Sequence, residues 1–527
     1  MSESTCSGKA AVRPSAVVLA AVCMTFVGAF TQAAGAQSSA APIACDPNAS
    51  LNILAYREQN TLDPGKSVGP QSDATRYWIY DVLIRVTPEG GLAPGLATSW
   101  KFVSPTVMRV TLRRGVTFHD GLPFNAAAVK ATYERNKSLP GVSPSFTQPM
   151  AVVKDVTVAS EYEVDYELKA PTPQFAFALT ASPGMVVSPA ALKEPLDVNA
   201  VGAGPFKLVK FSPNAVADLV RNDQYWDKTA LACHPKEVHL FDVQDTQALL
   251  NGALKGQYHV ARIDPNQVPQ AKAAGLVVKS VATAQIHSFW FDFKNPALRN
   301  PAVRKAMMYA IDREALAKGL GLGLALPATQ IFPPGSYAYS PAPEHQPAAY
   351  RYDPEKARKL LADAGYPNGI TLKVVIQPLT FDQTLLQAVQ VQMAKAGITL
   401  EIQQITSYSQ YLNHQGDTYF GMGGGRADPF DFLQAQTSAN GIYNPDGYPP
   451  TQQLTDLVAQ IAKTEPTDST RPGLLQRASG AVTDDARVIP VMVLQFNWVL
   501  SPCVVNFNPP SFGALQPFGL GWKAGCK

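Results

Sequence analysis

The sequence has little charge and almost no excess of either sign. Only 16% of its 527 residues are charged, and 44 Lys and Arg residues stand against 41 Asp and Glu residues, which gives a formal net charge of +3. The basic residues form no run of five or more. A protein that binds a nucleic-acid backbone needs concentrated positive charge, so the sequence indicates no nucleic-acid partner.

The short motifs of the common enzyme classes are missing too. The sequence contains no G-x-S-x-G, H-E-x-x-H, G-x-x-x-x-G-K-[ST] or G-x-G-x-x-G pattern. The one close pair of histidines, His234 and His239, is expected on a loop and the following strand with the rings on opposite sides, which does not suit a metal site. Adjacent Asp484 and Asp485 are typical of a solvated helix end. We therefore expect no enzyme, no metal and no cofactor.

Proline and glycine are frequent instead. The 44 prolines and 37 glycines are spread along the chain without a repeat, which excludes a collagen-like chain. Strand and helix patterns alternate, as in an α/β fold, and the length predicts two to four lobes at roughly 100–200 residues per domain. We expect hairpins over residues 152–168 and 206–221, helices opened by Asn300-Pro301 and Asp353-Pro354, a helix over 383–396, a strand over 398–402, and an irregular surface excursion over 327–350.

The first 36 residues have a different character. Lys9 and Arg13 precede an uncharged stretch, residues 15–30, whose 16 residues fall short of the roughly 20 that a membrane-spanning helix needs. The small residues 34–36 then fit a cleavage site. We predict a secretory signal peptide over residues 1–36 and an exported mature protein that does not span the membrane. A membrane anchor is the alternative.

Four cysteines remain after such a signal: Cys45, Cys233, Cys503 and Cys526. Their even number, wide spacing and lack of a C-x-x-C pattern exclude zinc fingers and redox motifs, and export favours disulfides. Three pairings are possible. The short loop favours Cys503–Cys526, which leaves Cys45–Cys233, and four free buried thiols are the alternative.

Several segments together carry a resemblance to a known family. Residues 91–100 (GLAPGLATSW) and 111–129 (TLRRGVTFHDGLPFNAAAV) resemble the signature of the family 5 extracellular solute-binding proteins of ABC importers, the oligopeptide, dipeptide and nickel-binding group. The resemblance continues, in order, at residues 201–206, 300–313, 352–366 and 471–490. It thus covers nearly the whole mature chain.

The signature itself is expected to be scaffold. His119-Asp120-Gly121 predicts a tight turn with Gly121 in a left-handed conformation, and Asn125 is expected to cap the following helix. His119 is therefore interpreted as a turn residue, with a ligand contact as the alternative. Arg304 and Asp312, eight apart on one helix, are expected to serve folding.

The resemblance implies a fold and an activity. The fold is a two-lobed periplasmic-binding-protein-like clamp (type II, cluster C) with an extra inserted subdomain, which binds solute between its lobes by hinge closure. It places lobe I at residues 46–84, 202–284 and 491–527, the subdomain at 85–201 and lobe II at 285–490. The activity is capture of a small-molecule or peptide ligand by a monomeric periplasmic receptor that delivers it to ABC importer permease subunits. A secreted hydrolase or a folding helper with the same clamp is the alternative.

The resemblance also singles out residues for the ligand. Peptide-binding relatives keep a carboxylate for the peptide's α-amine at the position that aligns with Gly425. Either Asp428 has taken this role, or the ligand lacks a free amine and Arg426 binds its carboxylate or phosphate. A surface salt bridge is the alternative for Arg426, and a turn or helix cap is the alternative for Asp428.

Strand ends and crossing segments supply the remaining candidates, because these border the cleft of an α/β clamp. They are Tyr56 and Arg57 at the end of the first strand, His287 and Trp290 on the crossing strand, and Tyr443 and Asn444 in the loop after the Asp428 helix. Trp290 in the sheet core and a solvated Arg57 are the alternatives.

We predict that the mature protein starts at Gln37 and carries no lipid. A lipid would require Cys23 or Cys45, but Val22 is too large for the position before Cys23, and Cys45 lies beyond the apolar stretch. The intact mass of the exported protein measures this. A mass raised by acyl chains on an N-terminal Cys45 would contradict the prediction.

Overall fold

The computed structural model of the chain describes residues 44–54, 60–67, 73–87, 90–243, 245–376, 380–405, 416–425, 428–439, 441, 443–444, 446–508, 516–517 and 519–526. The predicted signal peptide, residues 1–36, lies outside these residues. No helix within them is long and apolar enough to cross a membrane.

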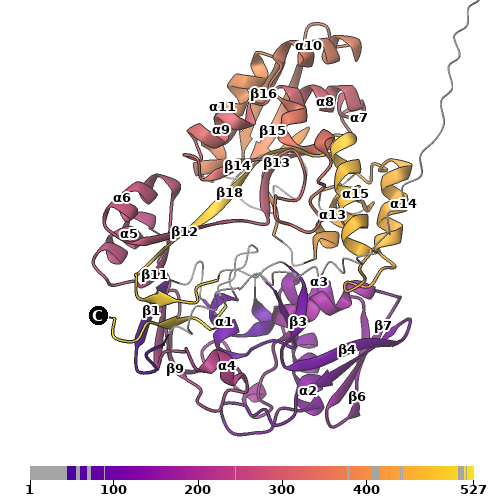
Figure 1. The fold of residues 1–527 in the computed structure, drawn as a ribbon. Coiled ribbons are helices and arrows are strands. Elements are labelled where there is room, and N and C mark those ends of the chain that lie inside the picture. Colours follow the sequence, from indigo (N-terminus) through magenta and orange to yellow (C-terminus); the bar gives the residue numbers. More distant parts are fainter. Residues whose placement is uncertain are drawn as a thin grey trace, which may run out of the picture. The chain divides into compact units, whose positions relative to one another are not determined.

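A twelve-stranded mixed sheet organises most of the described chain (Figure 1). Its order is β16-β15-β17-β13-β18-β11-β1-β10-β9-β8, and β12 and β14 also pair with β18. The strands are β1 (Ser50–Leu54), β8 (Phe206–Ser212), β9 (Val216–Arg221), β10 (Glu237–Phe241), β11 (Val260–Ile263), β12 (Val277–Ala282), β13 (Gln285–Phe291), β14 (Ala325–Pro327), β15 (Ile370–Ile376), β16 (Ile398–Gln404), β17 (Thr418–Gly424) and β18 (Ile489–Leu500).

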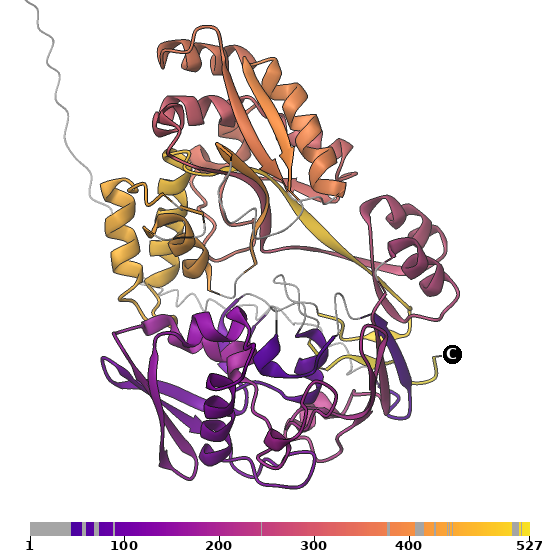
Figure 2. The ribbon, with the colours of Figure 1, turned by 180° about the vertical axis from the view of Figure 1, so that it is seen from behind.

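Strand β18 connects the two parts of this sheet. It pairs with β13 and β14 through residues 489–494, and with β11 and β12 through residues 495–500. Between β12 and β13, the Thr283 N–H donates to the carbonyl oxygen of Leu494 at 3.3 Å. The chain therefore passes between the two parts along two adjacent segments (Figure 2).

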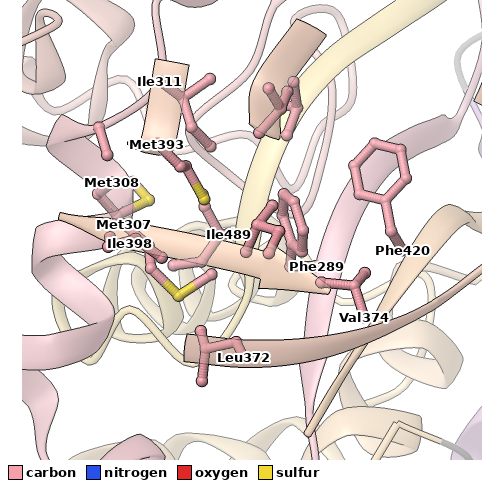
Figure 3. Close-up of a cluster of buried hydrophobic side chains, with 14 of the residues drawn as sticks. Phe289, Met307, Met308, Ile311, Leu372, Val374, Met393, Ile398, Phe420 and Ile489 are labelled. Carbon is pink, nitrogen blue, oxygen red and sulfur yellow. The ribbon is translucent and has the colours of Figure 1, made fainter. Parts of the chain in front are cut away.

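Helices cover both faces of the part formed by β13 and β15–β17. One face packs against α8 (Pro301–Tyr309), α10 (Pro354–Asp363) and α11 (Thr380–Ala394) through a core that includes Phe289, Phe420 and Ile489 (Figure 3). The other face packs against α13 (Pro429–Thr437), α14 (Gln452–Ile461) and α15 (Arg471–Asp484). The core side chains of this α/β/α unit are buried. Burial favours pairing of the polar groups beside them.

The other part of the sheet is covered by α1 (Ala74–Ile79) on one face and by α5 (Thr246–Leu254) and α6 (Val268–Ala273) on the other. A separate four-stranded sheet, β4-β5-β7-β6, packs against α2 (Ala126–Lys137). Its strands are β4 (Ala97–Ser104), β5 (Val107–Leu112), β6 (Val153–Ser160) and β7 (Glu163–Leu168). The smaller elements are β2 (Ile84–Val86), β3 (Leu92–Pro94), α3 (Pro144–Met150), α4 (Lys228–Leu231), α7 (Pro296–Arg299), α9 (Arg313–Gly319), β19 (Val504–Val505) and β20 (Gly521–Trp522).

Both disulfides predicted from the cysteine spacing are present. Cys45 pairs with Cys233, with their Cα atoms 5.1 Å apart, and Cys503 pairs with Cys526, with their Cα atoms 5.7 Å apart. A disulfide-bonded Cys45 has no thiol to offer a lipid. The pairing therefore supports the unlipidated mature protein.

Most local predictions are confirmed. The hairpins form as β6–β7 and β8–β9, and the side chains of Asn300 and Asp353 accept hydrogen bonds from the first turns of α8 and α10. Gly121 has φ +86°, and the Asn125 side chain accepts from the N–H of Ala128.

The surface excursion predicted for residues 327–350 is wrong. This irregular segment has buried side chains, among them Ile331 and Ala338. The Gln330 side chain accepts hydrogen bonds from the N–H of Ser340 and from the hydroxyl of Ser479 on α15. Proline limits regular structure here to short 3-10 turns, but it does not prevent burial.

Two histidines, the buried His234 and the half-buried His119, are expected to make the stability depend on pH. His119 contacts the carbonyl oxygen of Gly204 and His234 that of Pro517, both at 3.0 Å, which fits turn and core residues. Burial lowers the pKa of each ring from 6.5 to about 4. The unfolded chain therefore takes up protons near pH 6.5, whereas the native chain resists protonation until about pH 4.

We expect the free energy of unfolding to be highest above pH 6.5 and to fall as the pH decreases to 4, by on the order of 3 kcal/mol for each histidine. Urea denaturation at a series of pH values measures this dependence. His119→Gln and His234→Gln should each flatten it, even where they lower the stability at pH 7. An unchanged pH dependence in both variants would show that these rings do not cause it.

Candidate functional site

The candidate site lies where the parallel strands end. β15 runs parallel to β16 and to β17, so these strands finish at one edge of the sheet, at Ile376, Gln404 and Gly424. β13 runs antiparallel to β17 and starts at the same edge, with Gln285 opposite Gly424. Open α/β sheets bind ligands beyond the carboxyl ends of their strands.

Five of the eight predicted ligand residues fall within the described chain. They are His287, Trp290, Asp428, Tyr443 and Asn444. The other three, Tyr56, Arg57 and Arg426, lie outside the described residues. Their roles stay predictions.

Trp290 and Tyr443 form an aromatic stack beside β17. Their ring centroids are 4.7 Å apart with an interplanar angle of 23°, and Phe432 meets Tyr443 edge-on at 5.5 Å. Trp290 is 2% exposed and belongs to the core under α13–α15. This placement fits the alternative that Trp290 is a core residue of the sheet. Tyr443 is half-buried, so it is the member of this stack that reaches the surface.

The stack depends on a glycine in β17. A Cβ atom at Gly423 would lie 2.3 Å from the Trp290 ring. Any side chain at this position would displace the indole. The glycines of β17 are thus explained in part by the aromatic side chains packed against the strand.

Gly425 aligns with the position where peptide-binding relatives keep a carboxylate for the peptide amine. The uncharged side chain of Gln285 lies against it. Gly425 has φ +73°, and a Cβ atom there would lie 2.9 Å from Cγ of Gln285. Its N–H donates to the carbonyl oxygen of Ala284 at 3.0 Å, in the segment between β12 and β13. A longer residue at 425 would require both a new backbone conformation and movement of Gln285.

Asp428 is held inside the protein. Its Oδ1 accepts from the N–H of Phe430 at 3.0 Å, and its Oδ2 accepts from Nη2 of Arg471 at 2.6 Å. Both side chains of this ion pair are fully buried. Burial raises the pKa of the Asp428 carboxyl, and the Arg471 guanidinium acts against this rise. This geometry supports the helix-cap alternative, because each carboxylate oxygen of the fully buried Asp428 already accepts a hydrogen bond within the protein.

Arg471 and Asn444 hold neighbouring backbone in the same way. Arg471 Nη1 also donates to the carbonyl oxygens of Ile461 and Thr464, at the end of α14. Asn444 is fully buried, and its Nδ2 donates to the carbonyl oxygens of Ser438 and Tyr448. Asn444 therefore shapes the loop that carries Tyr443.

The structure adds one residue that the sequence analysis missed. The His287 ring contacts the Asp382 carboxylate, with Nε2 and Oδ1 2.9 Å apart and both side chains buried. Asp382 stands in the first turn of α11, one residue before the predicted start of that helix. An acidic residue in a first turn is ordinary, so no local signal marks this one.

We predict that Gly423→Ala lowers the free energy of unfolding by about 1–3 kcal/mol, the usual cost of overpacking, because the new Cβ meets the Trp290 ring. Gly421→Ala is the matched control on the same strand, since its nearest neighbour would be 3.8 Å away. Urea denaturation with tryptophan fluorescence measures both. Equal stability of the two variants would contradict the prediction.

Comparison with known proteins identifies the family. Residues 91–444 match the family described as bacterial extracellular solute-binding proteins, family 5 Middle. The glutathione-binding protein GsiB of Shigella boydii is 26% identical over 464 residues, which cover 82% of this chain and 86% of that protein. GsiB of Salmonella choleraesuis is 28% identical with the same coverage.

Solved structures share the fold. HbpA2 from Haemophilus parasuis has a TM-score of 0.79 at 21% identity, covering 90% of this chain and 100% of HbpA2. The periplasmic binding protein DppA from Helicobacter pylori, in complex with the peptide STSA, has a TM-score of 0.73 at 22% identity, covering 90% of this chain and 98% of DppA.

These findings confirm the predicted α/β two-lobed clamp. The family is one of solute-binding proteins and the named relatives are binding proteins, so the alternative of a secreted hydrolase is not supported. The sequence match and the fold lead to the same conclusion. The chain belongs to the family 5 bacterial extracellular solute-binding proteins.

Proposed function

We propose that this protein captures a peptide or a similarly sized polar solute in the periplasm and delivers it, as a monomer, to the permease subunits of an ABC importer. The family match over residues 91–444 carries this proposal. Relatives of similar length are named glutathione-binding proteins, and the structure of another relative, DppA, contains a bound peptide. A tripeptide and a tetrapeptide are both small polar solutes with charged ends.

The proposal includes the division into two lobes and an inserted subdomain. Lobe I comprises residues 46–84, 202–284 and 491–527, the subdomain 85–201, and lobe II 285–490. Two adjacent connections, the β12–β13 segment and β18, would then act as the hinge. Only short, extended segments join the parts there, and such segments absorb rotation with little loss of packing.

The proposed contact surface combines an aromatic and a polar part. Tyr443 would offer its ring to the solute, backed by Trp290. Gln285 would offer an uncharged amide next to Gly425. Arg426 follows Gly425 directly and would bind a carboxylate or phosphate of the solute, as predicted from the sequence.

Thermal shift against a compound panel tests the function. The panel contains di- to tetrapeptides, glutathione, opines, sugars and nickel complexes. A solute at 100 times its Kd should raise the free energy of unfolding by about 2.7 kcal/mol, because only the native state binds it. Single amino acids are the control compounds. A panel in which no peptide or other polar solute stabilises the protein would contradict the proposal.

Calorimetry on Tyr443→Ala then tests the contact surface with the best compound of that panel. We expect the affinity to fall by about 1–3 kcal/mol, the range for loss of one stacked aromatic ring. Tyr309→Ala is the matched control, because Tyr309 packs on Tyr350 in the helical layer on the other face of the sheet. Equal affinity of the two variants would place the ligand away from Tyr443.

A further inference from the structure

One buried carboxylate at the candidate site has an oxygen to spare. The Asp382 side chain is 4% exposed and the His287 side chain 1%. Oδ1 of Asp382 receives its hydrogen bond from His287. A carboxylate accepts but does not donate, so the His287 Nε2 carries the proton in this bond.

The second oxygen of this carboxylate, Oδ2, has no hydrogen-bond partner within the described part of the chain. Oδ2 is not one of the fully buried atoms that lack a partner in the described residues, so it keeps some contact with solvent. An oxygen of this kind can accept a hydrogen bond from a bound solute. Oδ2 points toward β17, where a Cβ atom at Gly421 would lie 3.8 Å from it. Because Gly421 has no side chain, the space beside Oδ2 stays open on that side.

Oδ2 of Asp382 lies at the edge of the sheet where open α/β sheets bind ligands. The ladder between β15 and β17 covers Thr418, Tyr419 and Phe420 and stops there. Gly421 is therefore the first residue of β17 beyond the end of β15. Asp382, at the start of the helix that follows β15, lies beside this step, at the carboxyl edge of the parallel strands.

We propose that Asp382, positioned by His287, binds a cationic group of the solute, an ammonium or a guanidinium, through Oδ2. This inference rests on the proposed function and names one chemical feature of the solute. A charged N–H donor gives a stronger hydrogen bond to a carboxylate than a neutral donor does.

The neighbouring groups make Asp382 the suitable carboxylate. Gly425 has no side chain, and both oxygens of Asp428 are occupied by Arg471 and the start of α13. Among the described residues, Asp382 is thus a buried acid at this edge with an oxygen available. His287 fixes the carboxylate and would act as a positioning residue.

Titration with methylammonium chloride tests the site without knowledge of the natural solute. The ¹³C resonance of the Asp382 carboxyl is assigned by its loss in Asp382→Asn and followed as the salt is added. We expect a saturable shift that sodium chloride does not reproduce. A shift equal to that in sodium chloride would overturn the proposal, whatever the panel of solutes shows.

Paired compounds extend the test to solutes. Glutathione and the peptide Ser-Thr-Ser-Ala are each compared with their N-acetylated forms by calorimetry. We expect a free-amine form to bind the native protein and to lose about 30-fold or more in affinity in Asp382→Asn, the loss for one partner of a buried charge pair. Asp363→Asn, which changes an exposed carboxylate at the end of α10, should bind as the native protein does.

The outcomes separate the two proposals. Equal binding of free and acetylated forms, or unchanged binding in Asp382→Asn, would overturn the role of Asp382 and leave the receptor function intact. Absence of binding by every panel compound together with a saturable methylammonium shift would support the cation site and contradict the choice of solute class. His287→Gln should weaken binding of the free-amine form more than that of its acetylated form, which a general loss of stability would not do.

Discussion

The arrangement of this protein depends on one continuous strand. β18 is twelve residues long, ten of its residues are buried, and its two halves pair with different sets of strands. Every unpaired backbone group in such a strand would cost free energy, so the neighbouring strands must complete the ladder along its whole length. This constraint joins segments that are distant in the sequence and brings the β12–β13 segment alongside.

The same constraint positions the candidate site. β13 follows directly from the segment beside β18, and β17 pairs with β13 along its whole length. Glycines in β17 let Trp290 pack against the strand at Gly423 and leave no side chain beside Asp382 at Gly421. The site is therefore formed by the absence of side chains on one strand as much as by the side chains around it.

Two buried carboxylates near β17 have different surroundings. The Asp428–Arg471 pair is neutral as a whole and is sealed among α13, α14 and α15, where it fixes helix ends. The Asp382–His287 pair retains one free oxygen at the edge of the sheet within the described residues. A buried ion pair contributes little net stability but imposes geometry, so the first pair is best understood as a scaffold. The second is the pair for which we propose a contact with the solute.

The sequence by itself determined the hairpins and the capped helices, because caps, turns and alternation act within a few residues. Its motifs also indicated the family, and it favoured the cysteine pairing that the structure shows without excluding the others. For Trp290 and Asp428 it offered both a ligand contact and a structural role, and the structure shows the structural contacts. Only the tertiary structure decided that much of residues 327–350 is buried and that Arg471 pairs with Asp428. It also decided that Asp382 contacts His287, which lies 95 residues away in the sequence. Such contacts join segments that are far apart in the chain, and no local pattern records which distant partner a side chain will meet.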